Sequence, residues 1–226
     1  GGPVAMRKRL QNPTLRRRVL YEMENGIPYK NSDPKDVLLV GFRLDSLNNL
    51  YKGKRLDEVA RAHGKSADET VLDLVVLDKS RIEAIFFLIS EENVRRVLQL
   101  PYVSIGSDAG SFDTTEVFAK WGIHPRAFGT FARILGKYVR EEKLIPLEEA
   151  IRRMTSLPAS NLKISRRGQI KPGFYADIAV FDPVNIRDHA TFENPMQYAT
   201  GMHHVFVNGI PVLLNGQHTG AKPGRV

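Results

Sequence analysis

The chain has 226 residues, 42% of them hydrophobic, and a formal net charge of +8. This size is sufficient for a sizeable core and one or two domains. The absence of cysteine excludes a disulfide framework and a thiolate metal site within the chain. No apolar run approaches the roughly 18 residues of a transmembrane helix, and the first residues are basic without an apolar signal segment. We therefore expect a cytoplasmic protein without a membrane partner.

The positive charge is concentrated in two stretches without acidic residues, 1–18 and 163–171. They hold ten Lys and Arg residues, so the remainder of the chain has a net charge of −2. Basic patches can bind nucleic acids or anionic surfaces, but a solvated helix face explains them equally. Because no RNP-like, zinc-finger or Gly-rich phosphate motif accompanies them, we do not expect a nucleic-acid partner. A non-catalytic anion-binding module that uses residues 1–18 remains one alternative.

Apolar residues with helical spacing run through residues 4–25 and are interrupted near Pro13. We expect Pro13 to open a second helix at its first turn. The apolar run 37–42 is typical of a buried strand. The stretch 56–64 predicts a short amphipathic helix closed by Gly64, and Ser66 with Glu69 predicts a capping box at the start of the next helix.

Further short apolar runs and helical stretches alternate up to residue 164. Residues 82–89 form a strand candidate, and the next helix starts at 90–93. A buried strand is expected around Tyr102, Val103 and Ile105, and two more helices over 128–143 and after Pro146. This alternation is typical of a parallel sheet with helical crossovers.

The pattern changes near residue 165. Residues 178–181 and 205–207 are β-branched or aromatic runs. Asn208-Gly209 predicts a tight hairpin turn, and Asn215-Gly216 predicts a second one. We therefore expect residues 165–226 to form a small, mainly β unit.

Asp108 is the strongest candidate for chemistry. It follows the strand expected at Tyr102–Ile105 and is flanked by Gly106 and Gly110. In barrel and open α/β folds, reactive groups lie at the carboxyl ends of parallel strands. A carboxylate there can transfer protons, whereas an Asp that only caps a turn is equally compatible with the spacing.

Several motifs in the same order resemble the N-acyl-D-amino-acid deacylases, or D-aminoacylases, of the amidohydrolase superfamily. They are GGPVAMRKRLQNPTLRRRV, GKRLDEVARAHGKSADETVLDLV, AIFFLISEENVRRVL, VSIGSDAG, the run 124–164 that begins with His124-Pro125-Arg126, GQIKPGFYADIAVFDP and the stretch 203–226. The resemblance covers nearly the whole chain and implies an α/β fold. Residues 1–164 would supply the later half of a (β/α)8 TIM-type barrel, and 165–226 the carboxyl-terminal strands of a small β-sandwich. A long amino-terminal portion of the protein would lie outside this chain.

The resemblance also implies zinc-dependent hydrolysis of the amide bond of N-acyl-D-amino acids. In that reaction the metal activates a water molecule, and the position matching the family's general acid/base is Asp108. The family's metal ligands, an HxH motif, a Cys and two further His, would lie in the missing portion. The six histidines here show no HxH or HxxxH spacing, so we expect no metal ligand in this chain beyond a contact from Asp108. We expect the isolated chain to be inactive.

Five other residues are candidates for substrate binding. Arg126 presents a planar fork that suits the substrate α-carboxylate, with a structural ion pair as the alternative. Phe86 and Ile89 match positions that line the acyl or side-chain pocket in the family, with ordinary core packing as the alternative. Ser107 adjoins Asp108, and His124 would orient Arg126 or form a hydrogen bond at the barrel mouth.

The enzymatic alternative is another amidohydrolase, of dihydroorotase or hydantoinase type. The combination SIGSDAG, HPR and FGTFARILG argues against it. The expected partners are a small N-acyl-amino-acid substrate and the missing amino-terminal half of the protein. A partial barrel would also leave a sheet edge and apolar faces open, which favours self-association.

Overall fold

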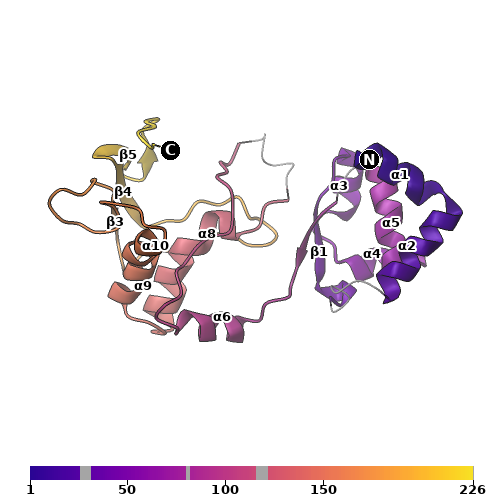
Figure 1. The fold of residues 1–226 in the computed structure, drawn as a ribbon, viewed down its shortest axis with the longest axis horizontal. Helices are drawn as coiled ribbons and strands as arrows, with labels where there is room; N and C mark the ends of the chain where they lie inside the picture. The colour runs from indigo at the N-terminus through magenta and orange to yellow at the C-terminus, as the bar shows by residue number, and fades with distance from the viewer. Residues whose placement is uncertain (26–31, 80–81, 116–121, 226) are drawn as a thin grey trace. The chain divides into compact units, whose positions relative to one another are not determined.

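The computed structural model describes residues 1–25, 32–79, 82–115 and 122–225. The chain divides into two compact units (Figure 1). Unit 1 consists of Gly1–Ser90 and Thr114–Ile123, and unit 2 of Glu91–Asp113 and His124–Val226. No helix in the described ranges is both long and apolar enough to cross a membrane.

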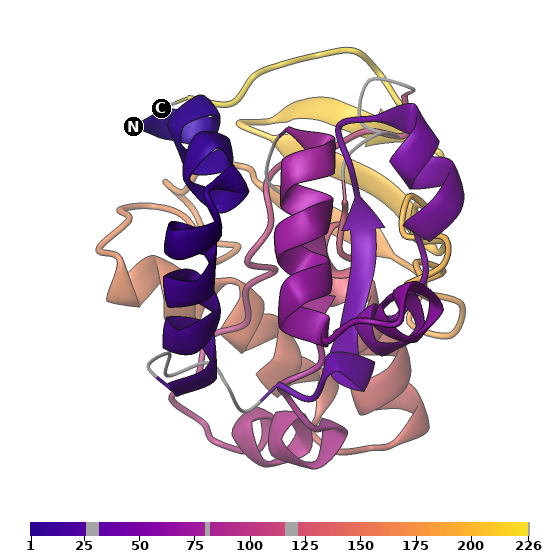
Figure 2. The ribbon, with the colours of Figure 1, turned by 90° about the vertical axis from the view of Figure 1, so that its right-hand side faces the viewer.

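Unit 1 is built from helices around a two-stranded sheet. Its elements are α1 (Gly2–Gln11), α2 (Pro13–Asn25), the 3-10 helix η1 (Pro34–Asp36), β1 (Val37–Gly41), α3 (Asp45–Tyr51), α4 (Leu56–His63), α5 (Ala67–Asp78) and β2 (Glu83–Phe86). Figure 2 shows α1 and α2, in indigo, on one side of α5, with β1 on its other side.

Local sequence signals for helix ends are confirmed in unit 1. The side chain of Asn12 accepts hydrogen bonds from two backbone N–H groups of α2, at 3.0 and 3.1 Å, so α2 begins at Pro13 as expected. Ser66 and Glu69 form the predicted reciprocal capping box at α5, with bonds of 3.1 and 3.2 Å. Gly64 ends α4 with a φ of 62°, a left-handed conformation that glycine adopts without a steric penalty.

Strand β1 is buried along its whole length. Leu39 joins a core cluster with side chains of the surrounding helices, among them Val59 and Leu74. Leu38 and Val40 pack instead with Ile85 of β2. Because successive side chains of a strand point to opposite faces, β1 contributes to two apolar clusters at once.

The pairing of β1 with β2 corrects the expected parallel sheet. The two strands run antiparallel, with Val37 opposite Phe86 and Leu39 opposite Ala84. Residues on both faces of β1 are buried, and a strand buried on both faces gives the same continuous apolar run as a parallel strand. The burial predicted from the apolar run is confirmed, and the parallel direction expected from the alternation of apolar runs and helices is wrong for this pair.

Unit 2 combines helices with a four-stranded sheet. Its elements are α6 (Glu91–Leu98), α8 (Arg126–Arg133), the π-helix η2 (Ile134–Glu141), α9 (Leu147–Met154), α10 (Ser156–Asn161), β3 (Ile178–Phe181), β4 (Met202–Val207), β5 (Ile210–Leu214) and β6 (Gln217–His218). Figure 1 shows α9 beside α10 and the sheet strands β3, β4 and β5 together.

The sheet of unit 2 is antiparallel, in the order β3-β4-β5-β6. Both predicted Asn-Gly turns are confirmed. Asn208 and Gly209 have φ values of 51° and 79°, and Asn215 and Gly216 have 48° and 76°. Positive φ at both central residues is the geometry of a type I′ hairpin turn. These strands lie in the range 165–226 for which the sequence predicts β structure, whereas the domain boundary at 164/165 stays a prediction.

The core of unit 2 joins the helices to the chain that follows β3. Its buried residues are Leu98, Ala132, Ile134, Leu135, Tyr138, Ile145, Ala150 and Ile186. Helix η2 packs tightly here at Gly136, where an added Cβ would lie 2.8 Å from the carbonyl oxygen of Ile186. A larger residue at Gly136 would push η2 away from this core.

Candidate active site

Asp108 lies in unit 2 on an irregular segment, residues 103–113, that precedes α8. The strand predicted around Tyr102–Ile105 is wrong. Tyr102 is 71% exposed, and the N–H of Ile105 donates to the carbonyl of Arg153 at 3.2 Å. Strand backbone groups need a ladder partner, and no strand in the described ranges pairs with this segment.

The carboxylate of Asp108 forms an exposed ion pair. Its Oδ2 lies 3.0 Å from Nη2 of Arg126, and the Asp108 side chain is 89% exposed. The backbone of Asp108 is left-handed, with a φ of 48°. This conformation is uncommon outside glycine, although Asp tolerates it better than most residues. The turn directs the carboxylate of Asp108 to the first residue of α8.

His124 holds the backbone at the start of α8. The N–H of Arg126, the first residue of this helix, donates to Nδ1 of His124 at 3.0 Å. The ring of His124 packs edge-on against Phe192, with 5.2 Å between centroids. Burial, followed by the charge of Arg126, lowers the pKa of His124. The neutral ring is therefore favoured, which keeps Nδ1 available as an acceptor.

The structure brings three of the predicted site residues together: Asp108, Arg126 and His124. Ser107 precedes Asp108 and is half-buried. Phe86 and Ile89 belong to the other compact unit and are 55% and 77% exposed. Neither side chain belongs to a core cluster of the described residues. Their role in a substrate pocket stays a prediction.

The residues of this structure do not fit a complete zinc centre. Among the described residues, no group of three or more His, Cys, Asp or Glu side chains could hold a metal ion. A protein zinc site uses three or four such ligands. The carboxylate of Asp108 faces the guanidinium of Arg126 rather than further ligating side chains. Asp108 alone could supply at most one ligand.

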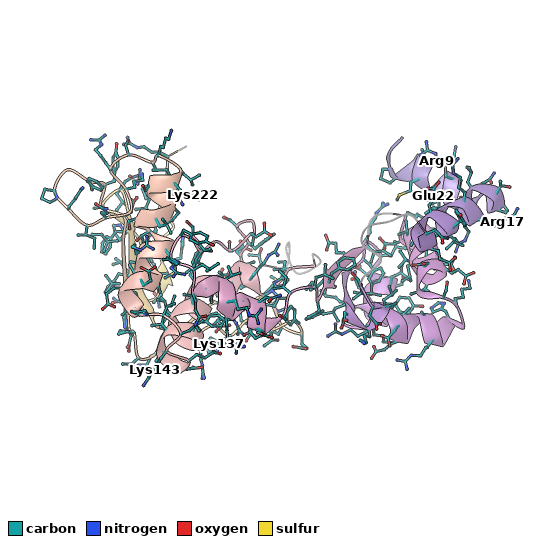
Figure 3. All side chains as sticks on the ribbon, turned by 60° about the horizontal axis from the view of Figure 1, so that its bottom comes forward. Arg9, Arg17, Glu22, Lys137, Lys143 and Lys222 are labelled. Carbon is teal, nitrogen blue, oxygen red and sulfur yellow. The ribbon has the colours of Figure 1, made fainter. Side chains whose placement is uncertain are left out.

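A cavity of about 340 Å³ in unit 2 lies beside η2 and the chain after β3. Charged side chains line it, and the basic ones form ion pairs with acidic ones. Arg133 pairs with Asp188 at 3.3 Å, and Lys137, labelled in Figure 3, contacts Glu91. Arg140 donates to the carbonyl of Ile186 at 2.7 Å. These contacts make the cavity wall a network of ion pairs rather than an open anion site.

Sequence reasoning does not single out a second cluster, Glu149, Arg152 and Arg153 of α9. Glu149 forms ion pairs with both arginines, at 2.7 and 2.8 Å. The spacing of three and four residues is the sequence signal that could have found these pairs. This spacing does not reveal that the two arginines also contact the segment that leads to Asp108.

The sequence matches the amidohydrolase family over residues 42–213. The D-aminoacylase of Alcaligenes xylosoxydans xylosoxydans is 42% identical over 174 residues, which cover 77% of this chain and 34% of that protein. This chain therefore spans about a third of the length of that curated relative.

Solved structures agree in fold. A crystal structure of D-aminoacylase has a TM-score of 0.70 and 37% identity, over 82% of this chain and 36% of that chain. N-acyl-D-glutamate deacylase from Bordetella bronchiseptica, crystallised with zinc and a phosphonate inhibitor, has a TM-score of 0.67 and 29% identity, over 88% and 42% of the two chains. The α/β fold is thus similar to that of the D-aminoacylases. This chain belongs to the amidohydrolase family.

Proposed function

We propose that this chain is part of a zinc-dependent deacylase that hydrolyses the amide bond of N-acyl-D-amino acids. The observation that carries the proposal is the 3.0 Å pairing of Asp108 with Arg126 in an amidohydrolase-family chain. The reaction needs a carboxylate that moves a proton. Its substrate carries a free α-carboxylate, which a guanidinium fork binds in bidentate fashion.

We propose that Asp108 acts first as a base and then as an acid. It accepts a proton from the attacking water and delivers it to the leaving amine nitrogen. Because its side chain is 89% exposed, the carboxylate is accessible to both. Exposed ion pairs contribute at most about 1 kcal/mol. Arg126 can therefore exchange Asp108 for the substrate carboxylate at little cost, and the exchange frees the base.

Zinc would supply the chemistry that these side chains lack, because it lowers the pKa of a bound water and polarises the scissile carbonyl. Its ligands would lie in the remainder of the protein, apart from a contact from Asp108. In the whole protein, residues 1–164 would belong to the later half of a TIM-type barrel and 165–226 to a β-sandwich. The similarity to D-aminoacylase structures supports this arrangement.

The proposed substrate carries an apolar acyl group or side chain. Phe86 and Ile89 expose apolar surface, and burial of such surface by a ligand is favourable. A negatively charged substrate side chain would gain nothing from either residue. Ser107 adjoins the base and would offer a hydroxyl to the substrate.

Asp108→Asn in the whole protein tests the proposal. The variant keeps the shape of the side chain and removes the base, so turnover should fall about 10²–10⁴-fold with zinc still bound. Glu148→Gln is the matched control, because Glu148 is an exposed carboxylate on α9 and the change removes the same charge. Wild-type turnover of the Asp108→Asn variant with metal bound would show that the assignment is wrong.

The non-catalytic alternative has one observation in its favour. Arg16 and Arg18 pair with Asp73 and Glu22, whereas the described residues offer no carboxylate partner to Arg9 and Arg17, which Figure 3 labels on α1 and α2. Binding of nucleic acid by the chain, with an affinity that falls steeply with salt, would favour an anion-binding module. Deacylation by the whole protein would favour the enzyme.

A further inference from the structure

A buried arginine ties helix α9 to the segment that leads to Asp108. The side chain of Arg153 is only 2% exposed. Its Nη1 donates to the carbonyl of Leu98 at 2.5 Å, and its Nε donates to Glu149 at 2.8 Å. A buried guanidinium without such partners is strongly unfavourable. These bonds therefore fix the end of α6 against α9.

Arg152 makes a second connection to the same segment. Its Nη2 donates to the carbonyl of Pro101 at 2.5 Å. The same guanidinium binds Glu149 in bidentate fashion, at 2.7 and 2.8 Å. Hydrogen bonds from Arg152, and then from Arg153, lower the pKa of Glu149 to about 2. Glu149 thus stays charged at neutral pH and holds both arginines in place.

Two further hydrogen bonds complete the attachment. The N–H of Ile105 donates to the backbone carbonyl of Arg153 at 3.2 Å, and Asn161 of α10 donates to the hydroxyl of Ser104 at 3.3 Å. Residues 98–105 are thus attached to α9 and α10 at four positions. Within the described ranges these four contacts, and no strand ladder, hold the segment. Asp108 follows three residues later.

We propose that Glu149, Arg152 and Arg153 are positioning residues that hold Asp108 in place through residues 98–105. The inference rests on the proposed function, in which Asp108 carries the proton. A proton carrier must stay within hydrogen-bond reach of the groups that it serves. A displacement of about 1 Å in a reacting group can cost about 10²-fold in rate.

The first experiment uses Arg152→Gln in the whole protein. Arg152 is 39% exposed, so this variant perturbs folding less than a change at the buried Arg153. We expect kcat to fall about 10- to 100-fold with KM little changed, because substrate binding is left intact. Arg152→Lys retains the charge and a donor for Pro101, and should restore part of kcat. Arg61→Gln is the control, since Arg61 pairs with Asp57 on α4 of unit 1.

A double-mutant comparison separates positioning from a general structural role. In the Asp108→Asn background, adding Arg152→Gln should lower kcat only slightly further, because Arg152 acts on turnover by positioning Asp108. Hydrogen–deuterium exchange of the whole protein gives a readout without activity. Arg152→Gln should speed exchange in residues 101–110 and leave exchange in β4 and β5 unchanged.

The results distinguish failure of the positioning role from failure of the proposed function. If Asp108→Asn impairs turnover and Arg152→Gln does not, the positioning role is overturned. The positioning role is also overturned if Arg152→Gln costs equally much turnover in both backgrounds, or if exchange rises throughout unit 2. If Asp108→Asn keeps wild-type turnover, the proposed function fails instead, and the exchange data still report whether Arg152 holds the segment.

Discussion

The guanidinium of Arg126 has two competing anions, the carboxylate of Asp108 in this structure and the substrate carboxylate in the proposed complex. The Asp108 side chain is 89% exposed, and its carboxylate lies 3.0 Å from the guanidinium of Arg126, so the pair is weak. His124 holds the backbone N–H of Arg126, not its side chain. The guanidinium is therefore free to turn while the start of α8 stays fixed.

Arg126→Lys tests this exchange in the whole protein. Lysine keeps the charge but loses the bidentate fork, so the preference for an N-acyl-D-amino acid over its carboxamide should fall. The measurement is kcat/KM for the two substrates in both proteins. Arg96→Lys is the matched control, because Arg96 forms an exposed pair with Glu92 on α6. An unchanged preference for the acid would show that Arg126 does not bind the substrate carboxylate.

Single residues of the candidate site could be predicted because short motifs carry them: Asp108 in VSIGSDAG, and His124 with Arg126 in HPR. Their contacts with one another are visible only in the structure. Arg152 binds a carbonyl 51 residues away, and Arg153 one 55 residues away. Local sequence patterns carry no information about such distant partners, so the sequence alone did not identify Glu149, Arg152 and Arg153 as positioning residues.

At the level of elements, the capping box of α5 is the sequence signal with the most direct energetic consequence. Ser66→Ala removes the acceptor for the N–H of Glu69. Loss of an N-cap costs about 1 kcal/mol of stability. Urea unfolding of the chain should show this loss. The control is Ser46→Ala, which removes a serine hydroxyl at an exposed position on α3 and should leave the urea midpoint nearly unchanged. Equal effects of the two changes would contradict the role of Ser66 as a cap.

Elements with strong local signals were predictable, and elements that depend on distant partners were not. The end of α4 at Gly64 and both Asn-Gly turns follow from backbone preferences of a few residues. The direction of β1 and the absence of a strand at Tyr102–Ile105 depend on which segments lie alongside. The expected single helix over 128–143 is divided into α8 and the π-helix η2, a change in hydrogen bonding that apolar spacing does not reveal.

For the whole molecule, the ion pairs and hydrogen bonds of the carboxyl groups predict a loss of stability in acid. Among the described residues, folding lowers the pKa of eight carboxyl groups: Asp33, Glu69, Asp73, Glu91, Glu142, Glu149, Asp177 and Asp182. A lowered pKa in the folded state means that the unfolded chain binds more protons as pH falls. The contribution is therefore complete above the ordinary values of 3.8 and 4.5, and it is lost as pH falls toward the value of about 2 of Glu149.

Urea unfolding from neutral pH down to pH about 3 checks this sign. The midpoint should move to lower urea as the pH falls through the range of these carboxyl groups. His124, whose pKa burial lowers from 6.5, adds a change of the same sign at higher pH. Glu149→Gln should reduce the acid sensitivity, because it removes a carboxyl group whose pKa is strongly lowered, to about 2. A urea midpoint that does not vary with pH would contradict the assignment of these ion pairs and hydrogen bonds.

The discontinuous path of unit 1 has a consequence for synthesis on the ribosome. The chain leaves this unit at Ser90 and returns with Thr114–Ile123. The returning residues matter for packing, since Ile123 is 4% exposed and Gly122 lies so close to Val40 that an added Cβ would be 2.6 Å from its side chain. Nascent domains begin to fold as they emerge. Residues 1–90 therefore cannot complete the packing beside Val40 until more than thirty further residues have been translated.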